Sequence, residues 1–83
     1  MRVSIKYFAS IREDIGVSGE LVDTEAATLA ALRDELIACG GARAKSLAHG
    51  RAVRMALNQV MSDETAALMD GVEVAFFPPV TGG

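Results

Sequence analysis

The residues with the most distinctive chemistry in this chain are its last six, Pro78-Pro79-Val80-Thr81-Gly82-Gly83. Two prolines fix φ and favour an extended spacer, which we expect to project the following residues away from the folded part. Gly82 and Gly83 have no Cβ, so a narrow tunnel in a partner protein can close around their backbone. The sequence therefore predicts a carboxylate on a thin, flexible arm formed by residues 78–83.

The Gly83 carboxylate is a poor electrophile, because it is anionic and its leaving group would be oxide. ATP can convert it into an acyl-adenylate, and a sulfur nucleophile can then replace AMP to leave a terminal thiocarboxylate. That group donates sulfur and can be reloaded, so the domain is a handle while other proteins supply the chemistry. The alternative is a frayed end without function, since chain termini are often disordered and small.

The strands that must position this arm are indicated by alternating apolar side chains. Residues 2–9 and 72–77 alternate most clearly, residues 53–58 alternate as well, and residues 19–23 are expected to form a return strand. The apolar positions that share one face of their strand are Val3, Ile5 and Tyr7, then Val53, Met55 and Leu57, then Val72, Val74 and Phe76.

The main helix is predicted to begin at Thr28, whose hydroxyl can accept a hydrogen bond from a first-turn backbone N–H, and to end at Gly40-Gly41. Arg33 is expected to lie away from its apolar stripe, together with Asp34 and Glu35. The stripe itself is formed by Leu29, Leu32, Leu36 and Cys39.

Shorter features complete the chain. Ser10 followed by Glu13 matches a capping box, which predicts a short helix that ends at Gly16. Residues 42–52 are ambiguous, with a short helix around Leu47 and then a loop. Turns are expected at Asn58-Gln59 and Asp70-Gly71.

This order of elements predicts an α+β domain in two layers, a mixed sheet with one main helix packed across it. It suits a β-grasp, in which the first and last strands lie side by side and parallel at the centre of the sheet. We therefore expect one domain over residues 1–77, followed by the arm over residues 78–83.

Composition excludes several classes of function. The chain has 8 basic and 11 acidic residues, a net charge of −3, which argues against a nucleic-acid-binding protein. No apolar run approaches the roughly 20 residues that a membrane-spanning helix needs. There is no Cys/His cluster with metal-ligand spacing, so no metal site is expected. The single cysteine cannot form an internal disulfide, which indicates a reducing cytoplasm.

The tail and several other segments resemble the MoaD family, the ubiquitin-like small subunits of molybdopterin synthase. The most specific match is Phe76-Phe77-Pro78-Pro79-Val80-Thr81-Gly82-Gly83, preceded by Asp70-Gly71-Val72-Glu73-Val74-Ala75. Tyr7-Phe8-Ala9 with Arg12-Glu13, and Ala56-Leu57-Asn58-Gln59, match further segments, whereas residues 40–52 and 62–69 carry no recognisable motif. Sulfur carriers for thiamine, cysteine or tRNA thiolation also end in Gly-Gly, but they typically lack the Phe-Phe-Pro-Pro run.

The resemblance implies a sulfur carrier that binds no cofactor itself. An adenylyltransferase related to ubiquitin-activating enzymes uses ATP to adenylate Gly83, and a desulfurase or other persulfide source converts it to a thiocarboxylate. The tail then enters the large synthase subunit, where cyclic pyranopterin monophosphate receives sulfur and becomes molybdopterin. Most of the catalytic groups belong to that large subunit, and two small subunits usually flank a dimer of large ones.

An apolar partner-binding patch is expected at the base of the arm. Phe8 and Phe77 fall on the polar faces of their strands, so neighbouring first and last strands would place both rings on the same outer face. Met61 could join them from the nearby turn, and the resemblance also places a partner there. The alternative is that scattered surface apolar groups have no role. The resemblance further suggests that Arg12 pairs with an acidic group of the activating enzyme, and the alternative is a solvated helix charge.

Other reactive or charged side chains have simpler interpretations. Cys39, on the apolar stripe, is expected to be a small buried hydrophobic residue rather than a sulfur-binding group. His49 is expected to be a loop residue, and Met55 and Met69 to fill the core. The basic residues of segment 42–54 are interpreted as a solvated face, with Arg54 as a rim residue beside Phe77. These residues are Arg43, Lys45, Arg51 and Arg54.

Three alternatives to this function remain open. The chain could be a sulfur carrier for another pathway, a ubiquitin-like protein modifier that forms isopeptide bonds, or a binding module in which Gly82-Gly83 has no role. A stand-alone enzyme is the least favoured, because no nucleophile–base pair and no phosphate-binding glycine loop is present.

Overall fold

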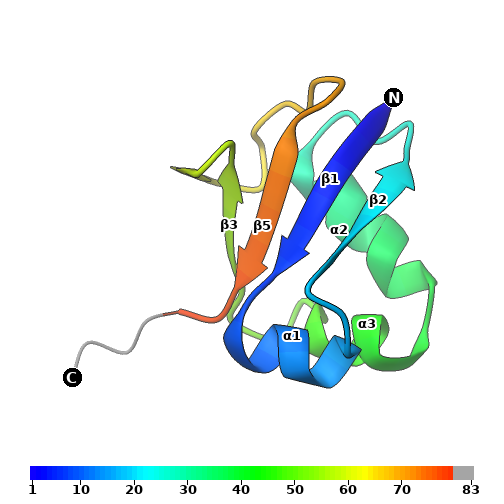
Figure 1. The fold of residues 1–83 in the computed structure, drawn as a ribbon, viewed down its shortest axis with the longest axis vertical. Helices are drawn as coiled ribbons and strands as arrows, with labels where there is room; N and C mark the ends of the chain where they lie inside the picture. Colours follow the sequence, from blue (N-terminus) through cyan, green and yellow to red (C-terminus); the bar gives the residue numbers. More distant parts are fainter. Residues whose placement is uncertain (80–83) are drawn as a thin grey trace.

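The computed structural model describes residues 1–79, and these form one mixed sheet with helices against one face and at one end (Figure 1). Helix α2 lies across the sheet, while α1 and α3 lie at the end where β1 and β5 finish (Figure 1). The predicted α+β fold with one main helix is therefore confirmed. Its elements are β1 (Arg2–Tyr7), α1 (Ala9–Ile15), β2 (Gly19–Asp23), α2 (Leu29–Ala38), α3 (Gly41–Ser46), β3 (Arg54–Leu57), β4 (Val60–Ser62) and β5 (Glu73–Phe77).

The strands follow the order β2-β1-β5-β3-β4 across the sheet. β1 pairs antiparallel with β2 and parallel with β5, and β3 pairs antiparallel with both β4 and β5. The last strand thus occupies the centre of the sheet, hydrogen-bonded on both sides. This confirms the predicted pairing of the first and last strands and places the end of β5 between β1 and β3.

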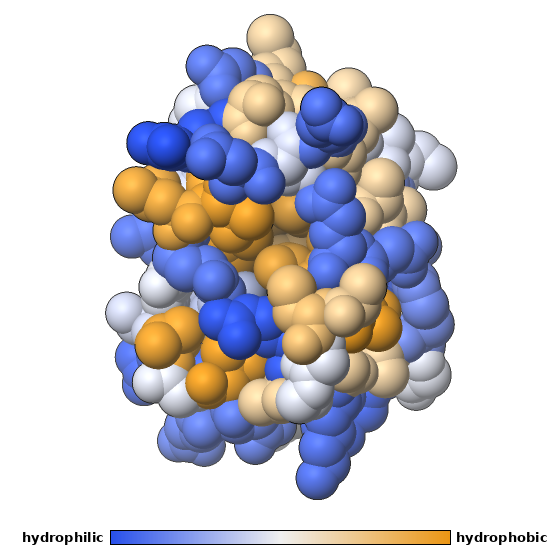
Figure 2. Space-filling view, turned by 90° about the vertical axis from the view of Figure 1, so that its right-hand side faces the viewer, coloured by the Kyte–Doolittle hydropathy of each residue, from blue (hydrophilic) through white to orange (hydrophobic). Residues whose placement is uncertain are grey.

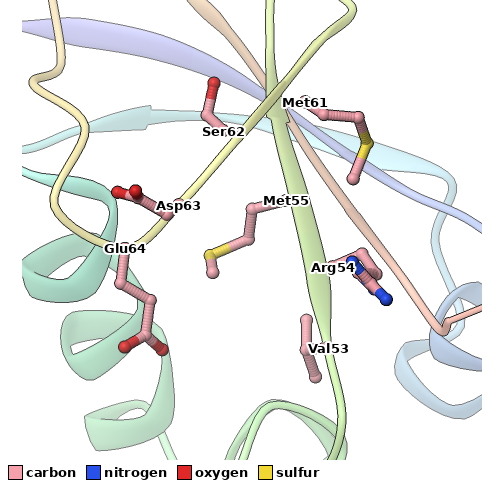
Figure 3. Close-up of a pocket in the computed structure, with 7 residues that line it drawn as sticks. All are labelled: Val53, Arg54, Met55, Met61, Ser62, Asp63 and Glu64. Carbon is pink, nitrogen blue, oxygen red and sulfur yellow. The ribbon is translucent and has the colours of Figure 1, made fainter.

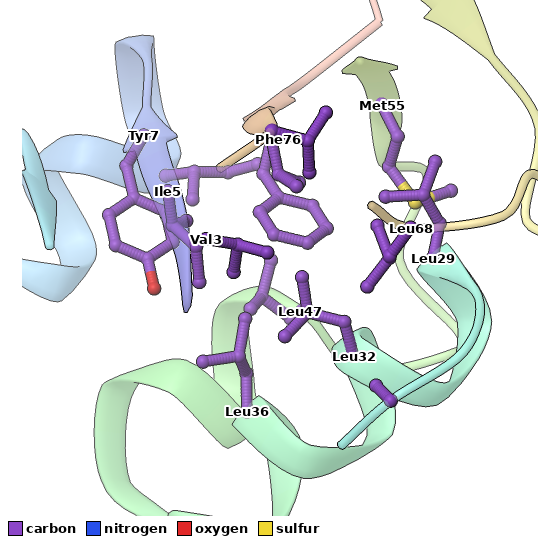
Figure 4. Packing of buried hydrophobic residues seen from close by; sticks show 14 residues of the cluster. Val3, Ile5, Tyr7, Leu29, Leu32, Leu36, Leu47, Met55, Leu68 and Phe76 are labelled. Atoms are coloured by element: carbon purple, nitrogen blue, oxygen red, sulfur yellow. The ribbon is translucent and has the colours of Figure 1, made fainter. Parts of the chain in front are cut away.

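The core fills the space between the sheet and the helices (Figure 4). The rings of Tyr7 and Phe76 stack there with their centroids 6.2 Å apart. Each fully buried apolar side chain contributes about 1.5–3 kcal/mol relative to an exposed one, so these residues hold the sheet against α2. The most deeply buried apolar members are Val3, Ile5, Tyr7, Leu29, Leu32, Leu47, Val74 and Phe76.

Helix α2 begins where the sequence predicted, but its last residue is Ala38, one before Cys39, the last member of the predicted apolar stripe. The Thr28 hydroxyl accepts a hydrogen bond from the backbone N–H of Ala31 at 3.2 Å. Cys39, however, is exposed, so the prediction that it is buried was wrong. It is the C-cap just past the last helical residue, its thiol lies against the carbonyl of Glu35 one turn back, and Gly40 with a φ of 77° then turns the chain toward α3.

Arg33, which was expected only to lie away from the apolar stripe, has a buried side chain. Its Nε donates to the carbonyl of Leu47 at 2.7 Å, and its Nη2 donates to the carbonyls of Ala48 at 2.8 Å and Arg51 at 3.2 Å. Its Nη1 pairs with Glu64 at 2.8 Å. The guanidinium is buried because it supplies donors to a turn whose carbonyls point inward.

Helix α1 does not use the predicted capping box. Phe8, not Ser10, occupies the N-cap, and no side chain caps the helix. The parallel ladder explains this difference, since the Phe8 N–H still donates to the carbonyl of Phe76 at 3.1 Å. The chain then turns at once through Ala9, which has a φ of 52°, so Ser10 already lies inside the helix. Gly16 ends α1 as predicted, with a φ of 91°.

The turns are close to expectation. Asn58 and Gln59, with φ of 47° and 70°, form the two-residue turn between β3 and β4, and Gly71 precedes β5 with a φ of 81°. Met55 is buried as predicted, but Met69 is 73% exposed because it lies in the loop before β5 rather than under the sheet. Among the described residues, no helix is long and apolar enough to cross a membrane.

Candidate functional site

The candidate site lies where β5 leaves the sheet. Phe76 points into the core, so strand alternation turns Phe77 to the opposite, outer face, where it is half-buried. Pro78 and Pro79 follow beyond the end of the strand and are also half-buried (Figure 1). The remaining predicted residues of the arm, Val80, Thr81, Gly82 and Gly83, lie outside the described residues. The predicted boundary between domain and arm therefore stays a prediction.

Phe8 joins Phe77 from the neighbouring strand end. Their ring centroids are 6.4 Å apart with an interplanar angle of 85°, an edge-to-face pair. Phe8 remains 46% exposed because no helix covers this face of the sheet. The expected convergence of the two rings is confirmed, whereas their role in binding a partner stays a prediction.

The strand register defines the rest of this outer surface. Ala56 lies opposite Ala75 of β5 on one side and opposite Met61 of β4 on the other. The two alanines, of which Ala56 is buried and Ala75 half-buried, make a low floor, and Met61, which is 55% exposed, projects beside it. We call the surface formed by Phe8, Ala56, Met61, Ala75 and Phe77 the outer patch.

Arg54 borders the outer patch, since it lies directly opposite Phe77 in the pairing of β3 with β5. Figure 3 shows Arg54 and Met61 on one side of β3, whereas Met55 extends to the other. A shallow cavity of about 400 Å³ lies along this part of the sheet. It is lined by Val53, Arg54, Met55, Met61, Ser62, Asp63 and Glu64.

Arg12 approaches the same end of the sheet from α1. Its backbone N–H donates to the carbonyl of Phe8 at 3.2 Å, which places it one helical turn after the aromatic ring. The Arg12 side chain is exposed, and no ion pair involving it is found among residues 1–79. It is therefore accessible to a partner, and its pairing with the activating enzyme stays a prediction.

The basic residues of segment 42–54 do not form one cluster. Arg43 pairs with Glu20 of β2 at 2.9 Å, and the same carboxylate accepts a hydrogen bond from the Tyr7 hydroxyl at 2.6 Å. Burial, with the adjacent Glu20 carboxylate, raises the pKa of Tyr7 far above its usual value. Arg43 is thus a structural contact between α3 and the sheet, while Lys45 and Arg51 are exposed elsewhere.

The described residues offer no catalytic constellation of their own. No group of three His, Cys, Asp or Glu side chains within residues 1–79 could hold a metal ion. His49 lies in a loop, as predicted, with its Nε2 2.5 Å from an Asp34 carboxylate oxygen. The only hydrogen bond of the Cys39 thiol in this part of the chain goes to the carbonyl of Glu35 at 3.5 Å.

Other exposed apolar residues are scattered. On the side of the molecule that carries β2, apolar areas alternate with hydrophilic ones (Figure 2). Leu21 of β2 is 69% exposed, and Val17 just before it is 43% exposed. Isolated residues of this kind need no partner, in contrast to the converging rings of the outer patch.

One feature of the site was missed from the sequence, namely the low floor of Ala56 and Ala75. A signal for part of it was available. A two-residue turn at Asn58-Gln59 fixes the register of the hairpin, so it places Ala56 opposite Met61.

A mixed sheet with parallel first and last strands at its centre, and one long helix across it, defines the class of ubiquitin-like β-grasp domains. The fold matches SAMP1 from Haloferax volcanii with a TM-score of 0.80 and 26% identity, over all of both chains. It also matches one chain of a structure described as a complex of subunits 1 and 2 of the molybdopterin-converting factor from Helicobacter pylori, with a TM-score of 0.70 and 27% identity over all of both chains.

Within this class, the chain belongs to the ThiS family, whose model matches residues 5–83. It is 38% identical over 81 residues to the molybdopterin synthase sulfur carrier subunits of Haemophilus influenzae and Escherichia coli. Each match covers 98% of this chain and 99% of the relative. The resemblance to small subunits of molybdopterin synthase is thereby confirmed.

Proposed function

We propose that this chain is the sulfur carrier subunit of a molybdopterin synthase. The observation that carries the proposal is its similarity, over nearly its whole length, to two relatives with that name. In this function the Gly83 carboxylate is adenylated, converted to a thiocarboxylate and consumed as it gives sulfur to cyclic pyranopterin monophosphate, which becomes molybdopterin.

The geometry of the fold supports a carrier rather than a catalyst. The central strand β5 ends at Phe77, so whatever follows Pro79 starts from the most firmly bonded part of the sheet. The outer patch lies at that point, where a partner that accepts the arm would also contact the domain. The carrier itself needs no cofactor, because ATP is used by the activating partner.

The proposal requires three kinds of partner. The large synthase subunit accepts the arm and binds the pterin, an adenylyltransferase related to ubiquitin-activating enzymes activates Gly83, and a desulfurase or persulfide supplies sulfur. The Helicobacter pylori neighbour is described as a complex of subunits 1 and 2, which supports the first of these. Nucleic acid and membranes have no part in this function. The lone cysteine of the chain supports a reducing compartment, the cytoplasm.

Intact mass spectrometry tests the loading step. The full chain is incubated with ATP, the activating enzyme and a sulfur donor, and we expect a mass increase equal to the exchange of one oxygen for one sulfur. A matched chain without Gly83 should show no increase. Loaded protein mixed with the large subunit and cyclic pyranopterin monophosphate should then form molybdopterin and return to its starting mass. A loaded chain that yields no molybdopterin with its own large subunit would contradict the proposal.

The same tail chemistry could serve a protein modifier or a sulfur carrier of another pathway. The structural similarity to SAMP1 gives the modifier function a specific basis. A modifier would form isopeptide bonds with lysine side chains, which appear in cell extracts as larger species that depend on Gly83. A carrier for thiamine, cysteine or tRNA thiolation would copurify with a different acceptor enzyme and leave molybdopterin synthesis unchanged when deleted.

A further inference from the structure

Arg54 stands beside the outer patch, on the outer face of β3. It lies opposite Phe77 across the β3–β5 ladder, where facing side chains have their Cβ atoms about 4.5–5.5 Å apart. Residues two apart on a strand share a face, so Arg54 is also next to Ala56, which faces Met61. The Arg54 side chain therefore lies at the border of the patch, near both its aromatic and its methionine parts.

The nearby carboxylates already have partners. Glu64, which lines the same cavity as Arg54, pairs with the buried Arg33 at 2.8 Å. Asp63 accepts hydrogen bonds from the backbone N–H of Thr65 at 2.9 Å and from its hydroxyl at 2.5 Å. Those bonds stabilise the charged carboxylate and lower the pKa of Asp63.

The other cations on the outer faces of the strands, Arg2 and Lys6, each have a carboxylate partner on an adjacent strand, and Arg2 lies 3.1 Å from Asp23. Lys6 lies 3.9 Å from Glu73, a neighbour on the adjacent strand. Among residues 1–79, no ion pair or side-chain hydrogen bond involves Arg54. A protein surface that covered Phe77 and Met61 would remove water from an arginine that this fold does not neutralise.

Removing water from a guanidinium is costly unless hydrogen-bond acceptors replace it. A carboxylate is the best-matched acceptor, because it can take two parallel N–H bonds from the planar guanidinium. Apolar contacts discriminate weakly between partners, whereas an unmatched charge disfavours a wrong partner strongly. A partner that fits this surface therefore needs both an apolar area and a carboxylate at its border.

We propose that Arg54 is a specificity-determining contact, pairing with a carboxylate that the large synthase subunit places at the border of its apolar contact with the outer patch. This inference rests on the proposed function, because it assumes that the large subunit covers the patch. It adds the chemical nature of the partner surface and the residue of this chain that reads it.

The test compares Arg54→Met and Arg54→Glu with Arg51→Met and Arg51→Glu in the full-length chain. Arg51 is an ideal control, because it carries the same charge on an exposed side chain three residues away, in the loop before β3. Binding to the purified large subunit is measured by calorimetry, and circular dichroism melting confirms that each variant is folded. We expect about 10-fold weaker binding for Arg54→Met, about 100-fold for Arg54→Glu, and less than about 2-fold for both Arg51 variants.

A salt series and a charge reversal complete the test. The difference between the wild type and Arg54→Glu should shrink as salt rises from about 0.05 to about 1 M, because screening weakens the pair. An acidic-to-arginine change in the large subunit should restore binding to Arg54→Glu. Unchanged binding by Arg54→Met, or equal losses for Arg51→Glu and Arg54→Glu, would overturn the inference while leaving the proposed function intact. A wild-type chain that does not bind the large subunit would overturn both.

Discussion

Phe76 and Phe77 are adjacent and chemically identical, yet they lie on opposite faces of β5. Phe76 is fully buried and stacks on Tyr7 at 6.2 Å, under the cover of the helices. Phe77 is half-buried and meets Phe8 edge-on at 6.4 Å, on the face that no helix covers. The comparison teaches that a single step along one strand moves an aromatic ring from the core, where it stabilises the fold, to a surface that a partner could reach.

The largest effect is expected on the covered face. Phe76→Ala should lower the free energy of unfolding by about 3–5 kcal/mol, because it removes a buried ring and leaves a cavity that the core cannot fill. Urea unfolding followed by circular dichroism measures this loss. The matched control, Phe77→Ala, should cost less than about 1.5 kcal/mol. Equal losses for the two variants would break the comparison between the faces.

The next effect is expected in binding rather than stability. Phe77→Asp should weaken binding to the large synthase subunit at least about 100-fold, or about 2.7 kcal/mol, because it places a charge in an apolar contact. Its melting temperature should stay close to that of Phe77→Ala. Calorimetric titration and a thermal melt of the same preparation give both values. Unchanged binding would show that the outer patch is not the interface.

A polar side chain on the covered side sharpens the comparison further. Arg33→Met should destabilise the fold by about 2 kcal/mol, because the carbonyls of Leu47, Ala48 and Arg51 lose their donor. Glu64→Gln keeps those bonds and should cost below about 1 kcal/mol, since Glu64 is 47% exposed. Urea unfolding of the two variants distinguishes them. Similar costs would mean that the ion pair, not the turn, explains the burial of Arg33.

The smallest effect is expected at the edge of the core, where the Tyr7 hydroxyl donates to Glu20. Tyr7→Phe should cost about 1 kcal/mol near neutral pH. Because folding raises the pKa of Tyr7, the unfolded chain loses this proton first, so the stability of the wild type should fall as pH rises above about 10. The phenylalanine variant should lack that part of the fall. Urea unfolding at several alkaline pH values checks it, and parallel curves for both proteins would contradict the assignment.

Much of the covered face could be predicted from the sequence alone. The apolar residues Val3, Ile5 and Tyr7, and likewise Val74 and Phe76, recur at every second position, which is typical of a β-strand with one buried face. All five are buried. Thr28 as a helix cap depends only on local backbone geometry, so it was also predictable. The position of Phe8 and Phe77 followed from the same alternation together with the assumed pairing of β1 and β5.

The failures share a physical cause, because each depends on contacts far along the chain. Arg33 is buried because the turn after α3 presents backbone carbonyls to its guanidinium. One of these carbonyls belongs to Leu47, which is 14 residues further along the chain. Ser10 is no cap because the ladder to β5 extends to Phe8 before the helix begins. Met69 and Cys39 depend on where a loop and a helix end, which local periodicity does not determine. The arm itself was predicted from its chemistry, and that prediction remains to be tested.

The central position of β5 has a mechanical consequence. Its backbone is hydrogen-bonded to β1 on one side and to β3 on the other. The chain leaves the sheet in the direction of β5, which is perpendicular to these hydrogen bonds. A pull on the chain beyond Pro79 would load these bonds together in shear, whereas a pull on an edge strand could peel them apart one at a time. The centre of the sheet can in this way bear a pull on the end of β5 without unravelling.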